Sequence, residues 1–180
     1  MKTIAVVALC GLWAGVALAE DVKLAADNAK IVWTGTKPNG KHVGGFKKLA
    51  GKAVIADEPT DLKLDVEIDC ASLYSDDPKL TAHLKSPDFF SVKEHPKAKF
   101  SITAVEKDDS GYRVTGDLTL LGKTKEISFP AEISVKGKLT LAADFKINRS
   151  DYGMTFGQGM VDDEVSISLR VATKAAKKKS

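Results

Sequence analysis

Apolar and polar residues alternate in several long runs along this chain. The clearest run is residues 62–68, in which Leu62, Leu64, Val66 and Ile68 are separated by charged residues. Similar runs cover residues 98–104, 114–120, 127–135, 139–147 and 165–171. Strict alternation is typical of a β-strand with one dry and one solvated face. No strand–helix–strand rhythm is present, so we expect an antiparallel barrel or sandwich.

Turn residues and glycines divide the first part of the chain. We expect a first strand over residues 29–35, followed by a tight turn at residues 37–40, where Asn-Gly favours a hairpin. The next segment, residues 41–55, is rich in glycine, and glycines inside strands usually mark bulges or sharp bends. About eight strands are expected in total.

Residues 79–124 contain the single predicted helix. Leu80, His83 and Leu84 have helical spacing, and residues 75–77 offer side chains that can cap the helix. Phe89 and Phe90 follow it. Two strands then form a hairpin around the polar turn at residues 108–111. In the strand after this hairpin, Pro130 predicts an edge or a bulge, because proline cannot donate a ladder hydrogen bond.

The N-terminus predicts a cleaved secretory signal peptide. Lys2 precedes an apolar run that ends in Ala17-Leu18-Ala19, so we expect cleavage after Ala19. Acylation at Cys10, as in a lipoprotein, is a less favoured alternative. We therefore divide the chain into a signal peptide at 1–19, one domain at 20–173 and a basic tail at 174–180.

Charge and chemistry narrow the function. The formal net charge of +3 gives no case for nucleic-acid binding. The basic tail is expected either to be a solvated terminus or to touch an anionic membrane surface. His42, His83 and His95 lack metal-ligand spacing, and Cys70 is expected to be buried. We expect no catalytic residue, no metal site and no cofactor.

Several motifs resemble the YceI-like family of lipocalin-like bacterial lipid-binding proteins. They are HLKSPDFF from His83, HP-x-x-x-F from His95, G-D-L-T-L-x-G-x-T-K from Gly116, R-S-D-Y-G-M from Arg149 and V-D-D-E-V from Val161. The resemblance implies an all-β fold, an antiparallel eight-stranded extended β-barrel with one short helix. It also implies an apolar tunnel for a polyisoprenoid lipid, such as an isoprenoid quinone, and a periplasmic location.

Inward positions of the expected strands supply the candidate ligand contacts. Burial of a lipid tail there is worth ~0.8 kcal/mol per methylene, so binding would need no catalytic group. Small inward residues such as Ala98, Ala104 and Gly116 leave room for it. The predicted ligand-binding residues are Trp33, Phe46, Leu64, Val66, Phe89, Phe90, Phe100, Ile102, Val114, Leu118, Phe129, Ile133, Phe145, Ile147 and Arg149. Phe89 and Phe90 are expected either to gate the tunnel or to pack in the core.

Arg149 is the one charged residue in this set, and a buried charge needs a partner. Asp151, Asp163 and Glu164 are the candidates for a salt bridge that closes the barrel, which we favour over a contact with a ligand headgroup. Two other functions stay open. One is an isomerase or dehydratase using Arg149 with Asp151, and the other is a stress-response module with a filled barrel. Beyond the apolar lipid, we expect no nucleic-acid partner and leave a homodimer open.

Overall fold

The computed structural model describes residues 20–109 and 111–174. The predicted signal peptide and the lysines at 177–179 lie outside the described residues. No helix in the described part is long and apolar enough to cross a membrane.

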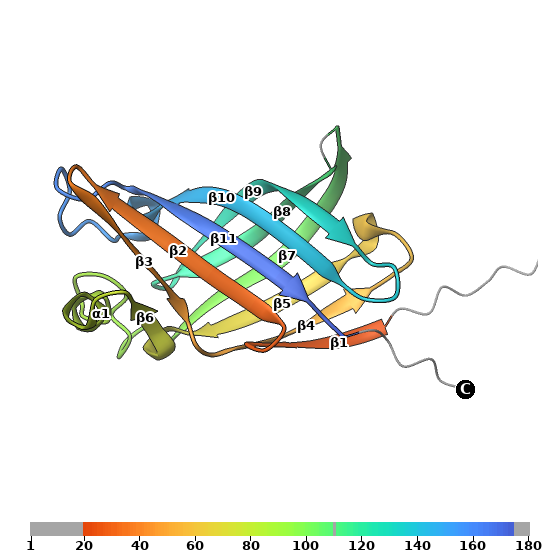
Figure 1. The fold of residues 1–180 in the computed structure, drawn as a ribbon, viewed down its shortest axis with the longest axis horizontal. Coiled ribbons are helices and arrows are strands. Elements are labelled where there is room, and N and C mark those ends of the chain that lie inside the picture. The colour runs from red at the N-terminus through yellow and green to blue at the C-terminus, as the bar shows by residue number, and fades with distance from the viewer. Residues whose placement is uncertain (1–19, 110, 175–180) are drawn as a thin grey trace, which may run out of the picture.

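The described chain forms one antiparallel sheet in the order β1-β4-β5-β7-β8-β9-β10-β11-β2-β3-β6 (Figure 1). Its strands are β1 (Glu20–Ala25), β2 (Ala29–Lys37), β3 (Gly40–Phe46), β4 (Leu49–Ile55), β5 (Lys63–Asp69), β6 (Leu73–Ser75), β7 (Lys97–Asp108), β8 (Gly111–Leu120), β9 (Lys123–Ser134), β10 (Thr140–Asn148) and β11 (Glu164–Ala172). The helices are α1 (Pro78–Leu84) and the 3₁₀ turns η1 (Pro59–Asp61), η2 (Cys70–Ser72) and η3 (Arg149–Tyr152).

The strand registers show how this sheet curls into a barrel. Strand β3 pairs with β2 and β6, and β4, which follows after Lys47 and Lys48, pairs with β1 and β5. Thus β1–β2, β3–β4 and β5–β6 act as three long strands, each interrupted at a bend. Because β11 pairs with β2, the last strand meets the first long strand. The predicted antiparallel barrel is confirmed, with eleven strand segments where about eight strands were expected.

Two glycines allow close backbone contacts beside these bends, as the glycine-rich pattern predicted. A Cβ on Gly51 would lie 2.2 Å from the backbone oxygen of Asp65 in β5. A Cβ on Gly44 would lie 2.1 Å from the backbone oxygen of Tyr74 in β6. Any side chain at either position would force the paired strands apart.

Strand β7 departs from the simple alternation. Its register with β8 shifts between Ile102 and Ala104, which marks a β-bulge. After the bulge Val105 is buried and Ala104 is exposed, so the inward position expected for Ala104 is wrong. In β9, Pro130 lies outside the three residues paired with β10, as its missing donor predicted.

Helix α1 is capped as the sequence predicted. Asp77 Oδ1 accepts hydrogen bonds from the backbone N–H groups of Lys79 (2.7 Å) and Leu80 (2.9 Å). The helix lies beside β6 at the left end of the barrel in Figure 1.

Cys70 is buried at the end of β5, as expected, with 2% of its surface exposed. Removal from water raises the pKa of its thiol to about 11. The thiol is therefore protonated at neutral pH and fills space as a small apolar group.

Candidate functional site

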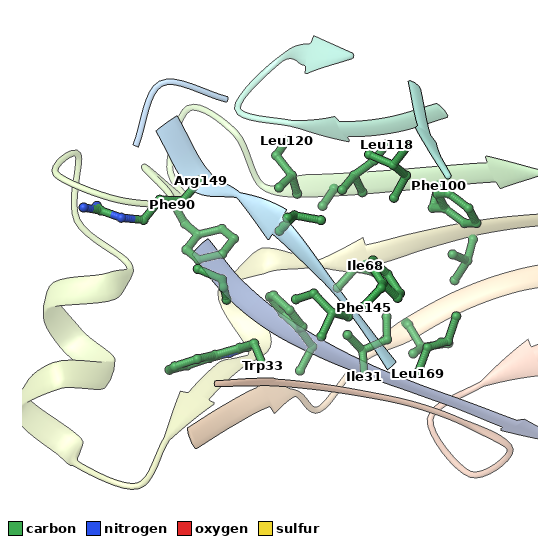
Figure 2. A pocket seen from close by; sticks show the side chains of 18 of the residues that line it. Ile31, Trp33, Ile68, Phe90, Phe100, Leu118, Leu120, Phe145, Arg149 and Leu169 are labelled. Atoms are coloured by element: carbon green, nitrogen blue, oxygen red, sulfur yellow. The ribbon is translucent and has the colours of Figure 1, made fainter. Parts of the chain in front are cut away.

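A cavity of about 190 Å³, counted as space open to the centre of a water molecule, lies inside the barrel (Figure 2). On that measure a single water needs about 10–15 Å³, so the cavity is much larger than a packing defect. Its lining is almost wholly aliphatic and aromatic. The interior is thus open, in contrast to the filled-barrel alternative.

Most residues predicted to bind ligand do line this cavity. They are Trp33, Phe46, Leu64, Val66, Phe89, Phe90, Phe100, Leu118, Phe129, Phe145, Ile147 and Arg149. In Figure 2, Trp33, Phe90 and Arg149 lie near the α1 end, whereas Phe100, Leu118 and Leu169 lie deeper in the barrel.

Ile102, Val114 and Ile133 do not line the cavity. Ile102 directly precedes the bulge in β7. Val114, which pairs with Val105, is fully buried in the hydrophobic core. Ile133 is partly buried and packs against this core. Alternation predicts which face a side chain occupies but not its depth along the barrel. This is why Val114 and Ile133 were among the predicted contacts although they lie outside the cavity lining.

Several lining residues were not among the predicted contacts. Strand β11 contributes Val165, Ile167, Leu169 and Val171, whose alternation was visible in the sequence. Met154 and Val161 come from the loop between η3 and β11. That loop has no periodic pattern, so nothing in the sequence marked its side chains as inward.

Aromatic rings fill part of the barrel beside the cavity. The rings of Phe129 and Phe145 are stacked, with centroids 4.0 Å apart and an interplanar angle of 6°. Phe100 lies 5.9 Å from Phe129 in a tilted arrangement. These rings come from β7, β9 and β10 and form a rigid wall for whatever occupies the space.

A second apolar cluster closes the α1 end. Leu73, Leu84 and Phe89 form its buried core, and Trp33, Phe46, Leu80 and Phe90 pack against it. Phe90 meets Phe46 edge-on at 5.9 Å between centroids. Phe89 and Phe90 therefore both pack in this cluster and line the cavity, and their gating role stays a prediction.

The rim of this end is completed by the loop after η3. His83 of α1 contacts the rings of both Phe89 and Phe156, with centroids 5.0 and 4.9 Å away. Its Nε2 lies 2.8 Å from Asp88 Oδ2. These contacts join α1 to the loop of residues 153–163, which we call the rim loop.

The buried guanidinium of Arg149 is hydrogen-bonded to the backbone of the rim loop. Only 4% of its surface is exposed, and its guanidinium donates to the backbone oxygens of Met154 (3.0 Å), Phe156 (2.7 Å), Val161 (3.3 Å) and Asp162 (3.2 Å). Nη2 also forms an ion pair with Asp163 at 3.0 Å. Of the three carboxylates considered as partners, Asp163 is the one found, while Asp151 is exposed.

Comparisons with known proteins agree with this architecture. The model of the YceI-like domain matches residues 23–173. A UPF0312 protein of Photorhabdus laumondii is 36% identical over 71% of each chain. The crystal structure of Burkholderia cenocepacia BcnA is 25% identical, with a TM-score of 0.73 over 81% of this chain and 96% of BcnA.

A further solved structure shares the fold. It is described as a polyisoprenoid binding domain from Saccharophagus degradans implicated in plant cell wall breakdown. It is 12% identical, with a TM-score of 0.67 over 88% of this chain and 100% of that domain. At this identity the likeness concerns the architecture of the barrel.

Proposed function

The chain belongs to the YceI-like domain family, and from this premise and the cavity we propose that it binds an apolar, chain-like lipid. The proposed cargo is a polyisoprenoid, such as an isoprenoid quinone, and the proposed setting is the periplasm. The protein would sequester or carry the lipid through water. The observation that carries this proposal is the open, apolar interior of the barrel.

The lining supports binding rather than chemistry. The described residues around the cavity include no carboxylate, imidazole or hydroxyl side chain. The guanidinium of Arg149 is engaged by backbone oxygens and Asp163, which leaves the proposed pair with Asp151 unformed. Burial of a hydrocarbon tail, at ~0.8 kcal/mol per methylene, supplies affinity without a reacting group.

The polyisoprenoid class is suggested by the domain from Saccharophagus degradans, whose description names such a ligand. Native mass spectrometry of protein purified from a bacterial periplasm tests the proposal. We expect a bound mass that organic extraction identifies as an isoprenoid lipid. A protein that carries no lipid, and takes up none from added isoprenoids, would contradict it.

Replacing Gly35 by phenylalanine should block uptake of the lipid. Gly35 lines the cavity on the face of β2 that carries Ile31 and Trp33, and a Cβ there meets nothing within 4 Å. The Cβ therefore meets no clash, and a phenyl ring that extends from it into the cavity would occupy space that the lipid needs. We expect the bound lipid to disappear from the native mass spectrum, while Gly35→Ala retains it. Equal lipid occupancy in Gly35→Phe would show that the lipid binds elsewhere.

Exposed apolar side chains suggest how a membrane-dissolved cargo reaches the cavity. The large hydrophobic residues exposed in the described chain are Val43 of β3 and Phe156 and Met160 of the rim loop. Val43 is hydrogen-bonded to Asp76, just before α1, and Phe156 contacts His83 of α1. Lys174 follows β11, whose arrow in Figure 1 points away from α1. We infer that a transient contact with a lipid surface uses the rim loop rather than the basic tail.

Substitution of both rim-loop residues by serine tests this contact. In Phe156→Ser/Met160→Ser we expect slower transfer of a fluorescent isoprenoid from phosphatidylcholine vesicles, with the equilibrium affinity little changed. Lys174→Ser is the control and should transfer at the original rate. If only the control variant were slowed, the contact would have to be assigned to the tail.

A further inference from the structure

Along the wall from β7 to β11, the described chain has one weakly paired junction, between β9 and β10. Strand β10 pairs with β11 along its whole length, and β9 pairs with β8 over residues 123–131. Between β9 and β10 the pairing covers only residues 132–134 and 140–142. The remaining stretch, where residues 123–131 lie beside residues 143–148, we call the seam. Along the seam each strand is paired on one side only.

Pro130 of β9 explains why the pairing stops. It pairs with Arg113 on the β8 side, where the ladder is unbroken, so its missing N–H belongs to the β10 side. The register of the paired residues, extended along both strands, places Pro130 opposite Asp144 of β10. A proline there removes a donor from the next step of the ladder. The pairing does not resume before β10 ends.

Polar side chains on the outer face beside the seam bond away from it. On the β9 side, the Ser128 hydroxyl is hydrogen-bonded to a threonine of β8 at 3.2 Å. On the β10 side, Asp144 forms an ion pair with Arg170 of β11 at 2.6 Å. Lys146 pairs with Glu164, also of β11, at 2.8 Å. None of these interactions ties β9 to β10.

The stacked rings of Phe129 and Phe145 meet across the seam, as the extended register predicts, with centroids 4.0 Å apart. Both rings line the cavity, and so do Ile127 of β9 and Ile147 of β10. A gap between the two strands would therefore lead directly into the cavity. Opening it separates one ring stack, whereas parting β8 from β9, or β10 from β11, breaks a continuous ladder of hydrogen bonds.

Packed side chains lie toward both ends of the barrel. Leu73, Leu84 and Phe89 form the buried cluster at the α1 end. Leu139 and Leu141, where β10 begins, are fully buried and lie outside the cavity lining. By comparison the seam is held by few interactions, so it is the part of the wall that opens at least cost.

The seam also reaches the rim loop. Strand β10 ends at Asn148 and continues into η3, after which the rim loop begins. Lys123, the first residue of β9, lies beside the start of this loop, because a Cβ on Gly153 would be 2.9 Å from Lys123 Nζ. A lipid surface that contacts the exposed Phe156 and Met160 would therefore lie near the mouth of the seam.

From these observations we propose that the barrel opens sideways along the seam and that the lipid chain passes between β9 and β10 to reach the cavity. The stack of Phe129 and Phe145 parts as the chain enters and re-forms behind it. In the closed state the two rings belong to the wall of the cavity. The inference rests on the proposed lipid-binding function and adds the route by which the cargo enters.

A reversible cross-link across the seam tests this route. Ser128 and Lys146 are exposed on the two strands and lie opposite each other in the extended register. In Ser128→Cys/Lys146→Cys, a short bis-thiosulfonate reagent joins the two thiols, and reduction releases them. The native Cys70 is buried, with 2% of its surface exposed, and does not compete for the reagent.

The probe is geranylgeraniol that carries a dansyl group, offered in phosphatidylcholine vesicles. We expect the cross-linked protein to take up the probe roughly tenfold more slowly than the same protein after reduction, because the strands can no longer part. The equilibrium affinity should stay the same, because a closed route slows entry and exit alike. Stopped-flow fluorescence gives the rate, and titration gives the affinity.

Thr119→Cys/Thr124→Cys is the matched control. These residues pair across β8 and β9 with their hydroxyls 2.8 Å apart, so a cross-link there joins strands that already stay together. Uptake should be as fast with this cross-link as without it.

Three results would overturn the inference. One is an unchanged rate of uptake when the seam is cross-linked, which would assign entry to an end of the barrel. Another is equal slowing by the control cross-link, which would make the effect a general loss of flexibility. In either case lipid binding itself would stand. Failure of the probe to bind even the reduced protein would instead overturn the proposed function, and this inference with it.

Discussion

Replacing Gly44 by alanine should lower the free energy of unfolding by about 1–3 kcal/mol, the usual cost of forcing an extra methyl into a filled space. The new Cβ would lie 2.1 Å from the backbone oxygen of Tyr74 and 2.2 Å from the Trp33 ring. Because one of these neighbours is backbone, it cannot turn aside. We expect β3 and β6 to separate and Trp33 to shift.

Gly35→Ala is the matched control for this prediction. Gly35 lies in the partner strand of the same hairpin, and its Cβ would meet nothing within 4 Å. Urea denaturation followed by circular dichroism should give a lower midpoint for Gly44→Ala and a nearly unchanged one for Gly35→Ala. Equal midpoints for the two variants would show that β3 and β6 can adjust to a side chain at Gly44.

The faces of the strands were predictable because alternation reports directly on which side chains meet water. Leu64 and Val66 of β5 and Phe129 of β9 line the cavity as their alternation indicated. The bulge after Ile102 was not predictable, because a bulge inserts a residue without any change in composition. Its consequence was the wrong inward position for Ala104.

The number of strand segments, and the depth of each side chain along the barrel axis, depend on how distant parts of the chain pair. At the bends that divide β1–β2 and β5–β6, the buried positions change from even-numbered residues, such as Leu24 and Ile68, to odd-numbered ones, Ala29 and Leu73. Val114 satisfies the inward pattern but lies in the packed core away from the cavity. The strand segment β1 was also not expected, because residues 20–25 carry only a short pattern.

The hydrogen-bond partners of side chains at the rim could not be predicted, because residue spacing in the sequence does not show which groups meet in the fold. Arg149 was expected to need a carboxylate, and Asp163 provides it. The four backbone oxygens that surround its guanidinium come from the rim loop, whose sequence has no periodicity. Likewise, nothing in the sequence indicates that Trp33 Nε1 is left without an acceptor.

Removing the guanidinium should have the largest effect on the rim. In Arg149→Met, the backbone oxygens of Met154, Phe156, Val161 and Asp162 lose their donor, and Asp163 loses its partner. Breaking a buried pair by removing one member costs about 3–5 kcal/mol, and we expect the lower end because Asp163 is partly exposed. The rim loop should also become a site of early cleavage in limited proteolysis.

Arg170→Met is the control, because Arg170 pairs with Asp144 on the exposed surface of β10 and β11. Exposed pairs contribute about 0–1 kcal/mol, so this variant should unfold close to the original midpoint. A similar small loss in Arg149→Met would mean that the loop is held by other contacts.

The variant Arg149→Met also separates the two roles considered for Arg149. If Arg149 contacts the ligand headgroup, geranylgeranyl phosphate, which has an anionic headgroup, should lose more affinity in Arg149→Met than squalene, which has none. If Arg149 only holds the rim loop in place, both lipids should lose affinity to the same extent, because both depend on the shape of the rim.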